Sequence, residues 1–126
     1  MGTIILGTGS YLPEKRLTND DLEKMVETND EWISSRTGIK ERRIAGPGEE
    51  AYILATRAAE KALKEAGVSA EEVDVLVVAT ISSHMLMPSC ACFVQKELGA
   101  NKAFAFDINA ACSGFLYGLD LADQYV

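Results

Sequence analysis

The spacing of apolar residues predicts a chain that alternates between helices and short strands. Residues 51–66 carry apolar side chains at a period of about 3.6 residues, which predicts an amphipathic helix. Residues 73–79 and 103–108 are almost continuously apolar, as in strands that are covered on both faces of a parallel sheet. Further helices are predicted over residues 89–98 and 115–126. This order of elements predicts an α/β fold with a layered, parallel sheet.

The first fifty residues follow a less regular pattern. An apolar, β-branched run at residues 3–6 predicts a strand. Thr18, with a carboxylate three residues later, predicts the start of a short helix, and Asn29 predicts the start of another over residues 31–36. Residues 42–44 are a further candidate strand. These strands are few for a parallel α/β sheet, so we expect additional chain to complete the architecture.

Composition narrows the classes of function. The length of 126 residues suits one compact domain. The net charge of −7 argues against binding to duplex nucleic acid. No apolar run approaches the roughly 20 residues of a membrane span, and residues 1–7 lack the pattern of a signal peptide. The odd count of 3 cysteines argues against a disulfide framework, so a cytoplasmic location is expected.

Cys112 is the most informative single residue. It follows the strand predicted to end near Ile108, lies in a turn of small residues, and precedes the last predicted helix. A helix N-terminus stabilises a thiolate, and its N–H groups could also hold the oxyanion of a reacting thioester. The same pattern fits a small thiol buried in a core. The local sequence leaves both interpretations open.

The other cysteines and the single histidine give weaker signals. Cys90 and Cys92 are two residues apart on a predicted helix and therefore point to different sides. This spacing is not the Cys-x-x-Cys of a zinc site, so we expect core cysteines and no metal. His84, in the loop after a strand, could act as a base for Cys112, although a solvated loop histidine fits the pattern better.

Trp32 and Arg36 form a second candidate site. They are four residues apart on a predicted helix and so share a face. Lys40, Arg42 and Arg43 follow as the only dense basic patch of an acidic chain. An indole can stack on a flat base, and a guanidinium can hold a phosphate. The alternative is a half-buried tryptophan surrounded by solvated charges.

Three segments resemble β-ketoacyl-[acyl-carrier-protein] synthase III, a condensing enzyme of the thiolase superfamily that initiates type II fatty-acid synthesis. The segments are residues 30–45 (DEWISSRTGIKERRIA), 107–115 (DINAACSGF) and 4–13 (IILGTGSYLP). The resemblance covers the whole chain. It implies a thiolase-like α/β fold in which residues 1–126 are the N-terminal half of a five-layer αβαβα architecture. The C-terminal half is absent from this chain.

The resemblance implies that Cys112 is the nucleophile that takes an acetyl group from acetyl-CoA. The acyl-cysteine would then condense with malonyl-acyl carrier protein, giving acetoacetyl-acyl carrier protein, CoA and CO₂. The family's catalytic His and Asn have no counterpart here, and His84 matches neither, so we expect the chain alone to be inactive. No metal or organic cofactor is implied, because acetyl-CoA is a substrate. The complete enzyme is expected to be a cytoplasmic homodimer.

The resemblance also assigns five residues to substrate binding. Trp32 matches the residue that stacks on the CoA adenine, and Thr28 lies at the position that lines the adenine site. Arg36 and Thr37 match positions that contact the CoA phosphate and pantetheine region. Met87 matches a position, often Phe in the family, that reaches across the dimer to bound the acyl pocket.

Two alternative functions remain open at this point. A related condensing enzyme, such as a polyketide-starter synthase or hydroxymethylglutaryl-CoA synthase, would use the same cysteine, although residues 32–39 fit synthase III better. An isolated half could instead be a non-catalytic acyl-CoA-binding or dimerisation module. Formation of an acyl-enzyme distinguishes this module from an enzyme.

Overall fold

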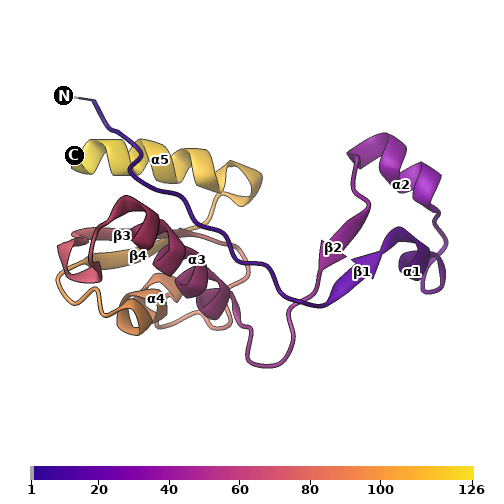
Figure 1. The fold of residues 1–126 in the computed structure, drawn as a ribbon, viewed down its shortest axis with the longest axis horizontal. Coiled ribbons are helices and arrows are strands. Elements are labelled where there is room, and N and C mark those ends of the chain that lie inside the picture. The colour runs from indigo at the N-terminus through magenta and orange to yellow at the C-terminus, as the bar shows by residue number, and fades with distance from the viewer. Residues whose placement is uncertain (1) are drawn as a thin grey trace. The chain divides into compact units, whose positions relative to one another are not determined.

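The computed structural model describes residues 2–126 and divides them into two compact units (Figure 1). Met1, the first residue of the segment considered for a signal peptide, lies outside the described residues. The first unit, here called the sheet unit, contains the residues up to Tyr11 together with Glu50–Val126. The second, here called the ribbon unit, contains Leu12–Glu49. Within residues 2–126, the helices are too short or too polar to cross a membrane.

The sheet unit is built on a parallel pair of strands with helices on both faces. Its elements are α3 (Ala51–Ala66), η1 (Ala70–Glu72), β3 (Val75–Ala79), α4 (Cys90–Leu98), β4 (Phe104–Ile108), η2 (Ala111–Ser113) and α5 (Gly114–Tyr125). β3 pairs with β4 from Val75 beside Phe104 to Ala79 beside Ile108. The predicted parallel α/β arrangement is therefore confirmed, and the predicted bounds of α3 match the structure.

Alternation along β4 explains the two helical layers. Side chains of successive strand residues point to opposite faces. Asp107 reaches the start of α4, whereas the ring of Phe106 lies edge-to-face with that of Tyr125 on α5, with ring centroids 6.5 Å apart. The fully buried side chains gather on the α4 side, where Cys90, Ala91 and Val94 lie. The densest packing is therefore between α4 and the sheet.

The predicted strand at residues 3–6 is wrong for this structure. The segment is not part of either sheet, and the side chains of residues 4–6 are exposed. Gly7 and Gly9 instead lie against the backbone of α3, where a Cβ on Gly7 would be 2.5 Å from the carbonyl oxygen of Ala62 (Figure 1). A strand needs a neighbour for its backbone groups, and none of the described strands pairs with this segment.

The ribbon unit contains two short strands and two short helices. They are β1 (Arg16–Thr18), α1 (Asn19–Glu23), α2 (Asp30–Thr37) and β2 (Glu41–Arg43). Both predicted helix starts are confirmed, because the side chains of Thr18 and Asn29 accept hydrogen bonds from the N–H groups of Asp21 and Trp32. Gly38 ends α2 with a φ of 70°, a left-handed conformation that favours glycine.

β1 was not predicted, and the candidate strand at residues 42–44 does not join the parallel sheet. β1 pairs antiparallel with β2, from Arg16 beside Arg43 to Thr18 beside Glu41. The two strands form a separate ribbon of 3 residues a strand. Such short strands, rich in charged residues, carry no readable alternation of apolar and polar positions.

Candidate functional site

Cys112 lies in a strained turn between β4 and α5. Ala111, the residue before it, has a φ of 45°, in the left-handed region that residues other than glycine rarely adopt. Such conformations cost free energy and are concentrated at functional sites. Cys112 itself is exposed, at the second position of η2 and two residues before α5 begins. The predicted position at a helix start is confirmed, whereas the alternative of a buried core thiol does not fit.

Close packing holds this turn against the ends of both strands. A Cβ on Gly114 would lie 3.1 Å from the Cβ of Ala79, so a larger residue would push α5 away from β3. The N–H of Ser113 donates to the carbonyl of Ala110 at 2.9 Å, and the N–H of Thr80 donates to the carbonyl of Ile108 at 3.1 Å. The side chain of Ser113 makes no cap for α5. The turn is thus fixed by backbone hydrogen bonds and by the close contact between Gly114, which has no side chain, and β3.

The other two cysteines have different environments. Cys90 is fully buried, and burial raises the pKa of its thiol, an effect that the nearby Asp107 carboxylate increases. Cys92 is half-buried, and the Ser89 hydroxyl donates to its sulfur at 3.2 Å. Within residues 2–126, no group of three or more His, Cys, Asp and Glu side chains could hold a metal ion. Cys112 is therefore the best placed of the three thiols to meet a substrate.

His84 makes specific ring contacts that the sequence did not predict. Its ring centroid lies 4.8 Å from that of Tyr52 on α3 and 4.6 Å from that of Phe93 on α4. The latter pair is nearly perpendicular, at 73°, a favourable geometry for aromatic rings. His84 is exposed, yet its ring attaches the loop after β3 to two helices. The structure thus gives His84 a packing role in this loop.

The ribbon unit brings Thr28 and Trp32 to one shallow pocket. The pocket has a volume of about 250 Å³ and is lined by Glu27, Thr28, Asn29 and Trp32. Trp32 is 53 % exposed, and the Arg36 guanidinium carbon lies 4.5 Å from its ring centroid. The prediction that these two side chains share a face is confirmed. A half-exposed indole next to a guanidinium can bind a flat, anionic group.

The cations of residues 40–43 do not form a patch of unpaired charges, because they bind to groups within the ribbon unit. Arg42 donates to the carbonyl of Leu17 at 3.2 Å and to Oδ1 of Asn19 at 2.9 Å. Arg43 donates to a backbone carbonyl before β1 at 3.0 Å. Lys40 lies 3.4 Å from a carboxylate oxygen of α2. Pattern alone could not show that these cations hold the ribbon together.

The two remaining predicted binding residues have contrasting surroundings. The Thr37 hydroxyl donates to the carbonyl of Ile33 at 2.7 Å and accepts from the N–H of Ile39 at 3.1 Å, so it helps to close α2. Met87 is exposed in the loop between β3 and α4.

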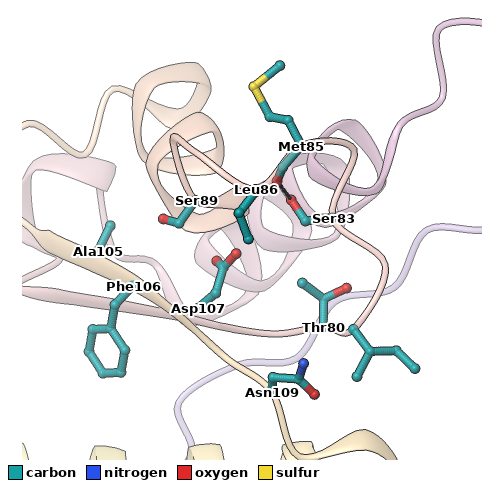
Figure 2. Close-up of a pocket in the computed structure, with 10 residues that line it drawn as sticks. Thr80, Ser83, Met85, Leu86, Ser89, Ala105, Phe106, Asp107 and Asn109 are labelled. Carbon is teal, nitrogen blue, oxygen red and sulfur yellow. Dashed lines mark hydrogen bonds between the residues drawn. The ribbon is translucent and has the colours of Figure 1, made fainter.

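Asp107 is a functional candidate that the local sequence pattern did not single out. Its two carboxylate oxygens accept hydrogen bonds from the N–H groups of Cys90 at 2.8 Å and Ala91 at 2.7 Å. It also lines a pocket of about 500 Å³, drawn in Figure 2, together with Leu86 and Asn109. The signal in the sequence was a single carboxylate in the otherwise apolar strand AFAFDI.

Comparisons with known proteins show similarity to β-ketoacyl-[acyl-carrier-protein] synthase III. The sequence profile of 3-oxoacyl-[acyl-carrier-protein (ACP)] synthase III matches residues 106–126, which include the Cys112 turn. The chain is 69 % identical over its whole length to a β-ketoacyl-[acyl-carrier-protein] synthase III of Desulfotalea psychrophila, of which it covers 39 %. Its sequence similarity therefore extends well beyond the segment that the profile matches.

Solved structures show the same fold. The crystal structure of 3-oxoacyl-[acyl-carrier-protein] synthase III from Aquifex aeolicus superimposes with a TM-score of 0.94 at 56 % identity, covering 98 % of this chain and 40 % of that one. A priming β-ketosynthase from the R1128 polyketide biosynthetic pathway gives a TM-score of 0.93 at 38 % identity, covering 97 % of this chain and 36 % of that one. The α/β fold is consistent with half of the thiolase-like fold.

The similarity extends over the whole of this chain but only part of each relative. The chain spans about two fifths of the length of the curated relatives that it matches, 39 % and 40 % in two of them. The segments that carried the resemblance, residues 4–13, 30–45 and 107–115, all fall inside the aligned region. The whole chain is therefore similar to a segment of β-ketoacyl-[acyl-carrier-protein] synthase III proteins, about two fifths of their length.

Proposed function

We propose that residues 1–126 are the N-terminal, nucleophile-bearing half of an acyltransferase that begins fatty-acid synthesis. A C-terminal half, with a His and an Asn that assist decarboxylation, would complete a five-layer αβαβα fold. The observation that carries the proposal is the exposed Cys112 on the strained turn before α5, in the segment that the family profile matches. Its thiolate attacks acetyl-CoA at the thioester carbonyl. A carbon–sulfur bond forms to Cys112, and CoA leaves as its thiolate.

The second half of the reaction uses the acyl-cysteine as an electrophile. Malonyl-acyl carrier protein loses CO₂, and the electron pair left on its α-carbon attacks the acetyl carbonyl. The carbon–sulfur bond to Cys112 breaks, and acetoacetyl-acyl carrier protein is released. Donors must stabilise the negative charge that develops on the thioester oxygens. The proposed steps use no metal ion or organic cofactor, because hydrogen-bond donors of the protein can stabilise the developing charge.

The ribbon unit supplies the proposed CoA site. Trp32 stacks on the adenine, Thr28 lines the same pocket, and Arg36 meets a phosphate. Thr37 contacts the pantetheine region, and Met87 bounds the acyl pocket of the neighbouring subunit in a cytoplasmic homodimer. The half-exposed indole and its stacked guanidinium support the adenine and phosphate assignments.

The decisive experiment is an intact-mass measurement on the complete protein after incubation with acetyl-CoA. One hydroxylamine-labile acetyl group should map to Cys112. Cys112→Ala should remove it and abolish acetyl transfer, with an unchanged far-ultraviolet circular dichroism spectrum. Cys92→Ala is the matched control, because Cys92 lies on α4 and should leave acylation intact. Turnover that persists in Cys112→Ala would disprove the nucleophile assignment.

A related condensing enzyme is the second candidate. The similarity to a priming β-ketosynthase of a polyketide pathway favours it, with a TM-score of 0.93 over 97 % of this chain. Acylation rates with a series of straight and branched acyl-CoA thioesters separate the two. Preference for acetyl-CoA supports the fatty-acid enzyme, whereas preference for a longer or branched starter supports the polyketide-type enzyme. A chain that binds CoA but is never acylated would instead be a non-catalytic module.

A further inference from the structure

Asp107 joins the strand that leads to Cys112 to the start of α4. Its carboxylate accepts from the N–H groups of Cys90 and Ala91, at 2.8 and 2.7 Å. These are the first two residues of α4, and the first N–H groups of a helix have no partner within the helix. Bonds from N–H groups to an ionised carboxylate are short and strong, and the helix dipole favours the negative charge. Asp107, which lies on β4, therefore caps the N-terminus of α4.

The helix start that Asp107 holds is also the end of a long loop. Residues 80–89 connect β3 to α4, and the N–H of Thr80 fixes their first residue to the carbonyl of Ile108. At the other end, Ser89 supplies its own cap, accepting from the N–H of Cys92 at 3.3 Å. Both ends of the loop thus attach to β4 or to the helix that β4 caps.

The middle of this loop lines the pocket of about 500 Å³. Leu86 is 96 % exposed, so packing of its own side chain contributes little to holding it in place. In Figure 2, Leu86 and the Asp107 carboxylate point toward each other across the pocket, whereas Phe106 points to the other face of β4. Leu86 lies between His84, whose ring contacts Tyr52 and Phe93, and the start of α4, so its position depends on the anchor at Asp107 as well as on those ring contacts.

The nucleophile turn begins on the same strand. β4 ends at Ile108, the residue after Asp107, and Cys112 follows in the next turn. A shift of the α4 start relative to β4 would move the loop relative to Cys112. We propose that Asp107 is a positioning residue that sets acyl-chain selectivity by fixing the loop of residues 80–89. This inference rests on the proposed acyl transfer at Cys112.

The test uses Asp107→Asn in the complete protein. Asparagine keeps the shape of the side chain but offers only one acceptor oxygen and no charge, so one of the two N–H groups loses its partner. Acylation is measured as kcat/KM with acyl-CoA thioesters of increasing chain length. The ratio between the longest accepted chain and acetyl is expected to change by about fivefold or more, because the pocket wall is displaced. Alkylation of Cys112 by iodoacetamide should change by less than about twofold.

Glu72→Gln is the matched control. Glu72 is also a capping carboxylate of the sheet unit, accepting from the N–H of Ser69 at 2.9 Å and from its hydroxyl at 2.8 Å. It caps η1 rather than α4, so its substitution should leave the chain-length ratio unchanged. A ratio that stays constant in Asp107→Asn, with a lowered melting temperature, would overturn the proposal, because Asp107 would then only stabilise the fold.

Hydrogen exchange gives a readout that does not depend on catalysis. In Asp107→Asn, the amides of residues 81–91 should exchange faster than in the wild type, and in Glu72→Gln they should not. Equal exchange in the wild type and Asp107→Asn would overturn the anchoring role. If the wild type is never acylated, the proposed function fails and the selectivity role fails with it. Unchanged selectivity in an acylated variant overturns only the present inference.

Discussion

The two units of this chain are stabilised in different ways. The ribbon unit is organised around Asn19, a polar side chain that is only 2 % exposed. Its amide nitrogen donates to Asp30 at 2.6 Å and to the carbonyl of Ile39 at 2.8 Å, and its oxygen accepts from Arg42 at 2.9 Å. Among the described residues of the sheet unit, the buried polar side chain is that of Thr56, which donates only to the carbonyl of Tyr52 one helical turn earlier, and the other buried side chains are small and apolar.

The sheet unit also leaves large apolar side chains uncovered. Phe115 and Leu116 of α5 are 70 % and 66 % exposed, and a cavity of about 540 Å³ opens between α5 and β3. Soluble proteins rarely leave extended apolar surface exposed unless something binds it. The ribbon unit also exposes apolar side chains, such as Met25 and Val26, but it has a buried polar centre at Asn19. The sheet unit combines its exposed apolar side chains with the cavity beside α5. The comparison predicts that folding of the sheet unit depends more on a cover for its α5 face than folding of the ribbon unit does.

The largest expected effect follows directly from that exposed surface. The 126-residue chain on its own should bind the dye ANS and self-associate at micromolar concentration, because its α5 face is apolar. The measurement is sedimentation velocity over a dilution series, together with dye fluorescence.

Phe115→Lys with Leu116→Lys should reduce both signals. Met25→Lys with Val26→Lys is the matched control, since these exposed apolar residues belong to the ribbon unit. A monomeric chain with a sharp, cooperative thermal transition would contradict the difference drawn between the units.

The next effect concerns the polar centre of the ribbon unit. Asn19→Ala should lower the free energy of unfolding of this unit by about 3 kcal/mol, because the buried Asn19 side chain and its partners Asp30, Ile39 and Arg42 lose several hydrogen bonds at once. Trp32 is the only tryptophan of the chain and lies in this unit, so urea denaturation followed by its fluorescence measures the change.

Asn101→Ala is the control for that substitution. Asn101 is exposed in the turn after α4, and its loss should change the free energy by less than about 0.5 kcal/mol. Equal effects of the two substitutions would show that Asn19 is not an organising residue.

The same contrast explains what the sequence could predict. The sheet unit follows regular periodicities, so α3, α4, β3 and β4 were predicted close to their observed bounds. The predicted strand at residues 3–6 was wrong because an apolar, β-branched run cannot show whether a pairing partner is present. The local sequence indicates whether a segment favours a helix or a strand, whereas the pairing of a strand depends on residues elsewhere in the chain.

Polar contacts between distant residues were the least predictable features. Asn19 looked like an ordinary residue of a helix start, and only the structure brings Asp30 and Arg42 to it. Arg42 looked like part of a basic surface patch for the same reason. For the candidate site, the local turn around Cys112 was predictable from small residues, whereas the bonds from Asp107 to α4 were not. Long-range hydrogen bonds leave no periodic signal in the sequence.

A smaller effect tests the binding role proposed for the ribbon unit. Trp32→Ala in the complete protein should raise the KM for acetyl-CoA about tenfold, because stacking on a base is worth roughly 1–3 kcal/mol. The kcat of the subsequent condensation should change little, since that step does not use the adenine. Steady-state kinetics at saturating malonyl-acyl carrier protein measures both. Trp32→Phe keeps an aromatic face and should restore most of the affinity. An unchanged KM in Trp32→Ala would remove this residue from the CoA site.

The smallest effect is a pH dependence confined to the ribbon unit. The Thr18 side chain donates to the Asp21 carboxylate at 2.8 Å, and this bond, followed by one from Lys24, lowers the Asp21 pKa from 3.8 to about 2. Because the folded pKa is below the unfolded one, the unfolded state binds more protons between these values. The stabilisation is therefore complete above about pH 4 and is lost as the pH falls toward about 2.

Asp21→Asn should remove this part of the pH dependence. Urea midpoints from Trp32 fluorescence, measured between about pH 5 and pH 2, should fall less steeply in the variant than in the wild type. Asp30, whose pKa is lowered mainly by its bond from Asn19, keeps a residual slope in both proteins, so the difference between the two curves isolates Asp21. Asp20→Asn is the matched control, because the capping bonds of α1 run to Asp21. Identical slopes in the wild type and Asp21→Asn would show that this cap contributes nothing to the stability of the ribbon unit.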